Sequence, residues 1–332
     1  MLLRFFRTIG AQILIFIPLI GLLLWMGPIF HGSLSPVLSD TIRMPIFEFL
    51  MNAFTGVEFI SIAVALVLVM AIAFLLVRLN TKFILINNRT YLPAIIYILI
   101  TSGIPDIQKL NPALLSAFAI LFVFEKVLDS YRFEGLFYDF FTASFVIACA
   151  SLIYPFIIFF IIILWTGIIL IRQFNWREWV FTFLGLLTPL ILALSYYYVV
   201  HDRASILFEK YTIFYTNTFQ YAGYTNETYI FLGILGFLLI ITSIFMAQML
   251  TTRKIVSRRA FVLLLWMFLY TLGVFFSIRQ VSVEIIYIIA IPISFLFSNF
   301  WVYVKSMFWG NLFLWMLLGS IIYAQASYYL FR

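Results

Sequence analysis

Acidic side chains that could act as general bases occur in one segment near the start of the 332-residue chain. This segment, Gly27–Phe54, carries Asp40 and Glu48 between apolar stretches. A carboxylate that reaches a reacting hydroxyl can take its proton during group transfer. We therefore regard Asp40 and Glu48 as candidate catalytic residues. The alternative is that Asp40 caps a helix, because Asp is among the preferred N-cap residues.

A dense group of tyrosines follows in the longest loop, His201–Thr228. Tyr211 and Tyr215 are one helical turn apart in this loop. We interpret them as candidate substrate-binding residues, since an aromatic ring offers a flat face for stacking on a sugar or a lipid headgroup. An aromatic belt explains the same residues without a ligand, because Tyr favours the headgroup level of a bilayer.

Arg279 and Asp106 are two further candidate substrate-binding residues. Arg279 lies in the segment Ser277–Glu284, and a guanidinium can hold a phosphate or pyrophosphate through two parallel hydrogen bonds. An arginine near the end of a span can instead extend its charged head to the membrane interface. Asp106 lies in a tight turn beside Pro105. We expect Asp106 to line the same outer cavity as Arg279. Short spans around a proline can mark a pair of helices that does not cross the membrane fully.

Metal ions, cofactors and nucleic acids are not expected as partners. The chain has one cysteine, Cys149, in an apolar run, and its two histidines, His31 and His201, are far apart in sequence. No metal site is therefore predicted. The absence of a P-loop sequence argues against an ATP-driven pump. The net charge of +7 comes without a basic cluster interleaved with polar surface, and in a membrane protein excess Lys and Arg usually report topology.

The overall composition places the chain among membrane proteins. Hydrophobic residues make up 65% of it and charged residues 10%, and the mean hydropathy is +1.13. A soluble domain carries about 25% charged residues. A chain with so few charges cannot cover a water-facing surface, so the lipid bilayer must be its solvent. We expect an all-α, polytopic transmembrane helix bundle in which residues 1–332 form a single integral membrane domain.

Apolar runs of roughly 20 residues predict about eleven transmembrane helices. The run Phe137–Ile171 is too long for one crossing, and Tyr154-Pro155 divides it, because proline removes a backbone donor and disfavours helix before it. No small-x-small cleavage site follows the first run, so we expect a span there and not a cleaved signal peptide. The predicted spans are Ala11–Phe30, Val57–Val77, Thr90–Ile104, Leu110–Phe124, the two halves of Phe137–Ile171, Trp179–Val200, Tyr229–Leu250, Phe261–Ser277, Val283–Val304 and Met307–Phe331.

Two further helices are expected to lie in the membrane interface on the outer face. Met44–Phe54 carries apolar residues at i, i+3 and i+4 spacing. Residues 206–218 place Ile206, Leu207 and Tyr211 on one helical face. Amphipathic helices of this kind lie along the boundary between headgroups and acyl chains.

The lysines and arginines of the loops predict the orientation in the membrane. With the N-terminus in the cytoplasm and strict alternation of spans, fourteen of the 20 cationic residues fall inside and six outside. This distribution agrees with the positive-inside rule and predicts a bacterial inner-membrane protein with a periplasmic C-terminus. Asp40, Glu48, Asp106 and Glu284 fall on or near the outer side. Carboxylates near span ends need partners or water, so the outer face has the better supply of acids for a reactive site.

Two stretches of the chain carry a family resemblance. They are Asn111–Leu164, which begins N-P-A-L-L-S-A-F-A-I-L-F-V-F-E-K-V-L, and Ile285–Phe300, I-I-Y-I-I-A-I-P-I-S-F-L-F-S-N-F. Both resemble an uncharacterised multi-pass inner-membrane protein family of Bacteroidota, a resemblance that brings no established activity.

The architecture also loosely resembles polyprenyl-phosphate-dependent, GT-C-like glycosyltransferases and polysaccharide polymerases. These enzymes share ten or more spans, short third and fourth spans and an outer acid after the first span. Asp40 and Glu48 occupy that approximate place, whereas the adjacent paired acids typical of many such enzymes are absent.

Three functions are consistent with these features. The first is a glycosyltransferase-like enzyme that acts on a polyprenyl-phosphate-linked sugar at the outer face, with Asp40 as general base and Arg279 holding the carrier's phosphate. The second is a non-catalytic membrane subunit or assembly factor of an envelope complex, which would bind other membrane proteins. The third is a lipid or sugar transporter. Convergence of Asp40, Asp106 and Arg279 on one outward-facing cavity would favour the enzyme hypothesis.

Overall fold

The computed structural model describes residues 11–31, 44–53, 58–86, 90–130, 137–171, 175–203, 205–216, 225–249, 255–278 and 281–330. Within these ranges the regular structure is entirely helical, with fourteen α-helices, α2 to α15, and the short 3-10 segments η2, η3 and η5. The predicted all-α class is therefore confirmed.

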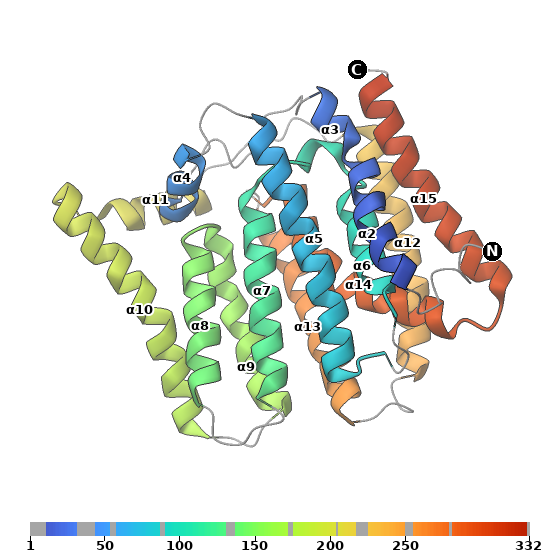
Figure 1. Cartoon of the computed structure of the whole chain (residues 1–332). Helices are drawn as coiled ribbons and strands as arrows, with labels where there is room; N and C mark the ends of the chain where they lie inside the picture. The colour runs from blue at the N-terminus through green and yellow to red at the C-terminus, as the bar shows by residue number, and fades with distance from the viewer. Residues whose placement is uncertain are drawn as a thin grey trace.

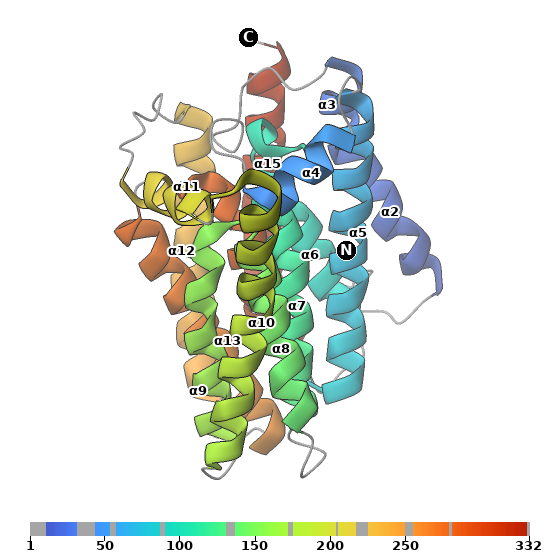
Figure 2. The ribbon, with the colours of Figure 1, turned by 90° about the vertical axis from the view of Figure 1, so that its left-hand side faces the viewer.

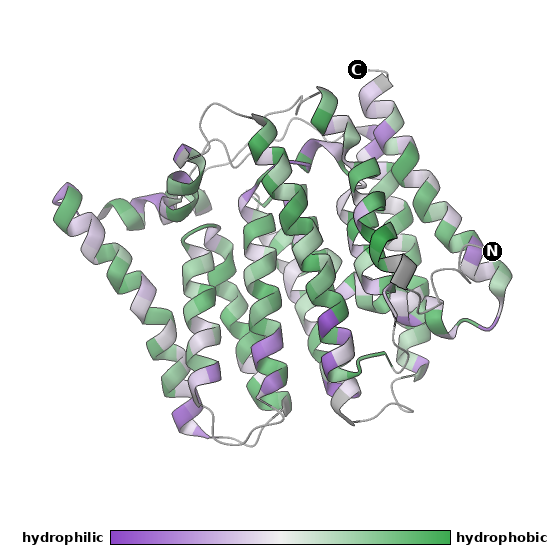
Figure 3. Ribbon diagram, viewed as in Figure 1, coloured by the Kyte–Doolittle hydropathy of each residue, from purple (hydrophilic) through white to green (hydrophobic). Residues whose placement is uncertain are grey.

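Hydrophilic residues gather at two opposite ends of the molecule, with an apolar band between them (Figure 3). The upper end, as drawn in Figure 1, carries α3 (Met26–His31), α4 (Pro45–Ala53) and α11 (Ser205–Thr216). The lower end carries the C-terminal turns of α5 (Glu58–Phe83) and α7 (Pro112–Asp129). This division is expected of helices whose apolar middles lie in hydrocarbon and whose ends reach water.

Helix α14 (Ile286–Tyr303) forms the centre of the bundle. It is preceded by η5 (Val283–Ile285), and 94% of the most apolar 18-residue stretch within Val283–Tyr303 is buried. A helix that is apolar all round must be covered by other helices or by lipid. Here the contacts come from α6 (Leu92–Thr101), α7, α12 (Asn226–Met249) and α13 (Ile255–Ser277).

The long apolar run after α7 folds into a helical hairpin. Helix α8 (Phe137–Ser151) runs upward, and η3 (Pro155–Phe160) with α9 (Ile161–Ile171) returns downward beside it (Figure 1). Tyr154 has extended backbone angles, φ −139° and ψ 107°. A residue before proline is pushed towards this conformation. The predicted break at Tyr154-Pro155 is present.

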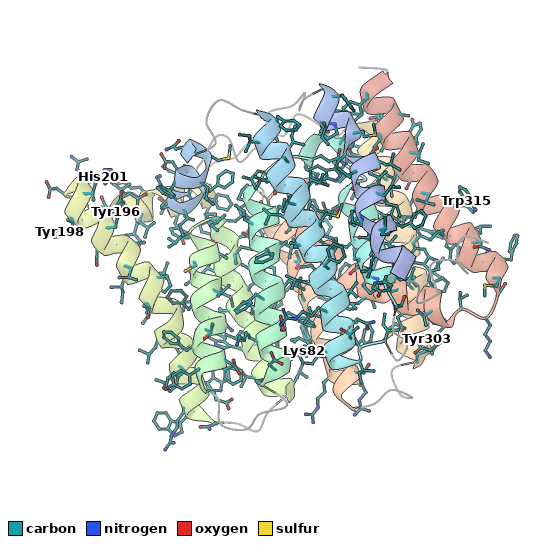
Figure 4. All side chains as sticks on the ribbon, viewed as in Figure 1. Lys82, Tyr196, Tyr198, His201, Tyr303 and Trp315 are labelled. Carbon is teal, nitrogen blue, oxygen red and sulfur yellow. The ribbon has the colours of Figure 1, made fainter. Side chains whose placement is uncertain are left out.

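Helix α10 (Trp176–His201) packs on α8 below and leaves the bundle above. Figure 4 shows Tyr196, Tyr198 and His201 at its far upper end. Helix α11 then runs back across the top of the α8–α9 hairpin, and α4 lies crosswise at the same level (Figure 2). Both helices occupy the ranges in which interfacial helices were predicted. Their location in a membrane interface stays a prediction.

Six helices among the described residues are long and apolar enough to cross a membrane: Phe59–Phe83, Trp176–His201, Asn226–Met249, Ser257–Ser277, Val283–Tyr303 and Met307–Tyr329. The last belongs to α15 (Met307–Leu330). The other five predicted runs form helices that are too short or too charged to qualify. With 10 residues, α6 rises about 15 Å, half of a hydrocarbon core of about 30 Å. The structure therefore shows several candidate spans but does not show eleven.

Candidate functional site

The predicted site residues fall into two separate places. Glu48, Tyr211 and Tyr215 come together where α4 and α11 lie over the α8–α9 hairpin. Asp106 belongs to η2 (Pro105–Ile107), which contacts α15 on another part of the upper end. Asp40 and Arg279 lie outside the described residues. The structure therefore does not bring Asp106 to the other candidates that it describes.

An ion pair joins the two crosswise helices. The Lys210 Nζ lies 2.7 Å from the Glu48 Oε2 and 6.0 Å from the centre of the Tyr197 ring. Burial lowers the pKa of the Lys210 ammonium, but the hydrogen bond to Glu48 and the neighbouring Tyr197 together raise it above its ordinary value. Lys210 is therefore charged at neutral pH, and Glu48 helps to hold α4 against α11.

The two tyrosines of α11 bond to the turn between α8 and η3. The Tyr211 hydroxyl is 3.1 Å from the Ser151 hydroxyl and donates to the Ser151 carbonyl at 3.2 Å. The Tyr215 hydroxyl donates to the Pro155 carbonyl at 3.3 Å. Burial raises the pKa of both phenols, and the neighbouring Tyr211 raises that of Tyr215 further. Both are neutral donors that dock α11 on the hairpin, and their role as substrate contacts stays a prediction.

Two glutamines organise the part of the upper end near Asp106. The side-chain amides of Gln108 and Gln325 both donate to the carbonyl oxygens of Leu24 and Ser102, over 2.8–3.4 Å. The Trp25 indole N–H also donates to the Ser102 hydroxyl at 3.1 Å. Helix ends leave carbonyls without intrahelical partners. These amides satisfy such carbonyls at the ends of α2 (Ala11–Leu24) and α6, and the amide of Gln325 ties both helices to α15.

A third polar group surrounds the start of α14, and sequence reasoning did not single it out. Glu284 in η5 is only 1% exposed. One turn later, the Tyr287 hydroxyl donates to the Ile107 carbonyl at 3.0 Å, and the Tyr97 hydroxyl donates to the Tyr287 carbonyl at 3.1 Å. A buried carboxylate in an apolar protein is costly, so Glu284 is a candidate functional residue. The sequence did contain one signal for this site, because Glu284 is the single acidic residue at the start of the apolar run Val283–Val304.

An apolar groove begins next to Glu284. We call it groove A: α12 and α13 form its walls, α14 forms its floor, and its volume is about 720 Å³. Val283 and Ile285, on either side of Glu284, line its upper part. Ile240 and Phe276 on the walls are 64% and 79% exposed, so the groove opens sideways to the surroundings of the bundle.

A second apolar groove lies on the other side of α13. This groove B, about 440 Å³ in volume, is lined by Phe159 and Ile162 of the hairpin and by α13 residues that include Trp266, Gly273 and Ser277. Phe159 also meets the Tyr215 ring edge to face, with centroids 6.0 Å apart. Groove B therefore adjoins the α11 helix that carries the predicted substrate-binding tyrosines.

Comparison with known proteins identifies no relatives: no protein-family model, no curated protein and no solved structure matches the chain. The fold and composition therefore define a class only. The chain is a multi-pass helical membrane protein with no family identified, and the apolar surfaces of its helices are suited to a lipid bilayer.

Proposed function

We propose that the protein is a glycosyltransferase-like enzyme that acts on a lipid-linked sugar at its upper end, with the carrier's polyprenyl chain in groove A. The observation that carries this proposal is the sideways opening of an apolar groove of about 720 Å³ beside the buried Glu284. A long hydrocarbon chain can enter such a groove from the bilayer without crossing water. Its headgroup then stays at the upper end, next to a carboxylate.

The predicted roles of two residues outside the described ranges extend this proposal. Asp40 would take the proton of the attacking hydroxyl, and Arg279 would hold the carrier's phosphate. In the sequence, Arg279 stands between Ile278, which lines groove B, and Val283, which lines groove A. This position fits a phosphate that belongs to a chain in either groove.

The proposed orientation puts the lower end in the cytoplasm of a bacterial inner membrane. Helix ends and loops in the lower half carry most of the described cations, Arg78, Lys82, Lys126, Arg177, Arg258, Arg259 and Lys305. An excess of Lys and Arg marks the cytoplasmic side of a membrane protein. The reaction would then take place on the periplasmic side.

A pair of glycine variants tests groove A as the carrier site. A Cβ added at Gly236, which lines the groove, or at Gly233, which does not, meets no atom within 4 Å. Gly236→Leu therefore fills groove A without a backbone clash, and Gly233→Leu is the matched control. With a photoreactive polyprenyl phosphate and the full chain in lipid nanodiscs, we expect crosslinking to fall at least fivefold in Gly236→Leu and to be unchanged in Gly233→Leu. Equal crosslinking of both variants would overturn the proposal.

Envelope glycans of cells provide the functional test. A strain without the protein should lose a glycan that the native chain restores and that Asp40→Ala, Arg279→Ala and Glu284→Gln fail to restore. An unchanged glycan profile with all three variants would exclude the proposed enzymatic function. A co-purifying membrane complex together with unchanged glycans would favour the assembly-factor alternative, and lipid movement between leaflets would favour the transporter.

A further inference from the structure

We draw no further inference here: the strongest candidate, the apolar groove B between the α8–α9 hairpin and α13, opens to the surroundings of the bundle, and nothing in the described part of the chain shows what covers it.

Discussion

The two tyrosines of α11 are consistent with two roles, contact with a substrate and attachment of α11 to the hairpin. Tyr211 and Tyr215 were expected to contact a substrate, and their hydroxyls bond to Ser151 and Pro155 at the α8–η3 turn. A buried hydroxyl without a partner would be costly. These bonds therefore explain both tyrosines as anchors of α11, and a ligand would contact their rings and not their hydroxyls.

Removal of the Tyr211 hydroxyl tests this role. Tyr211→Phe deletes the bond to the Ser151 carbonyl, so we expect the protein to lose about 1 kcal/mol of stability, the usual net value of such a bond. Tyr198, 65% exposed at the upper end of α10, provides the matched variant Tyr198→Phe with no expected loss. Thermal unfolding of the purified protein in detergent measures both. A Tyr211→Phe variant as stable as the native chain would contradict the anchoring role.

Glu284 is the residue whose importance the sequence conveyed least well. In the sequence it is one of several acids predicted on or near the outer side, five residues after Arg279. Its burial depends on α14 being enclosed by four other helices, and apolar composition alone does not reveal which span is central. The hydrogen bonds of Tyr97 and Tyr287 were unpredictable for the same reason, because their partners lie 180 or more residues away in the chain.

Among the elements, α8 and α10 make a close contact that depends on one glycine. A Cβ at Gly185 would overlap the Phe141 carbonyl oxygen and the Ser144 hydroxyl of α8. Small residues let helix backbones approach closely in membranes. Because α11 follows directly after α10, this contact also positions the crosswise helix above the hairpin.

Alanine at position 185 is therefore expected to separate the two helices. Overpacking usually costs about 1–3 kcal/mol, so Gly185→Ala should lower the unfolding temperature. The same substitution at Gly233, where the added Cβ meets open space, should instead be neutral or gain up to about 1 kcal/mol from helix propensity. Thermal unfolding in detergent compares the two variants. Equal effects of both substitutions would show that α8 and α10 do not approach closely at Gly185.

The positions of the helices were largely predictable, whereas their lengths were not. Proline marked the α8–α9 break through local backbone sterics. The second predicted span ended at Val77, but α5 continues to Phe83, and Lys82 in its last turn pairs with Glu125 at 2.8 Å and Asp129 at 2.6 Å on α7. Figure 4 places Lys82 near the lower end of α5. A charge that looks like a loop residue in the sequence thus lies on a helix and makes a tertiary contact.

At the scale of the whole molecule, the grooves could not be derived from the sequence. Each is lined by residues from helices that are distant in the chain, and its lining has the same apolar composition as the rest of the bundle. The two ends of the molecule, in contrast, follow from the alternation of apolar runs and charged loops. This alternation agrees with the described helix directions, and the membrane side of each end is open to a direct test.

Single cysteines on either side of α10 test the orientation of the molecule. Helix α10 has 26 residues and is about 39 Å long, enough to cross a hydrocarbon core of about 30 Å with some tilt. In a Cys149→Ser background, Arg177→Cys lies at its lower end and Glu209→Cys lies on the upper α11, both at exposed positions. A membrane-impermeant maleimide added to intact spheroplasts should label Glu209→Cys and leave Arg177→Cys unlabelled, with the reverse result in inverted vesicles. The expectation follows from the cations that gather at the lower end, because Lys and Arg residues are enriched on the cytoplasmic side of membrane proteins. Labelling of both cysteines from one side would mean that α10 does not cross the membrane, and labelling of Arg177→Cys alone from outside would place groove A, Glu284 and the proposed reaction at the cytoplasmic face.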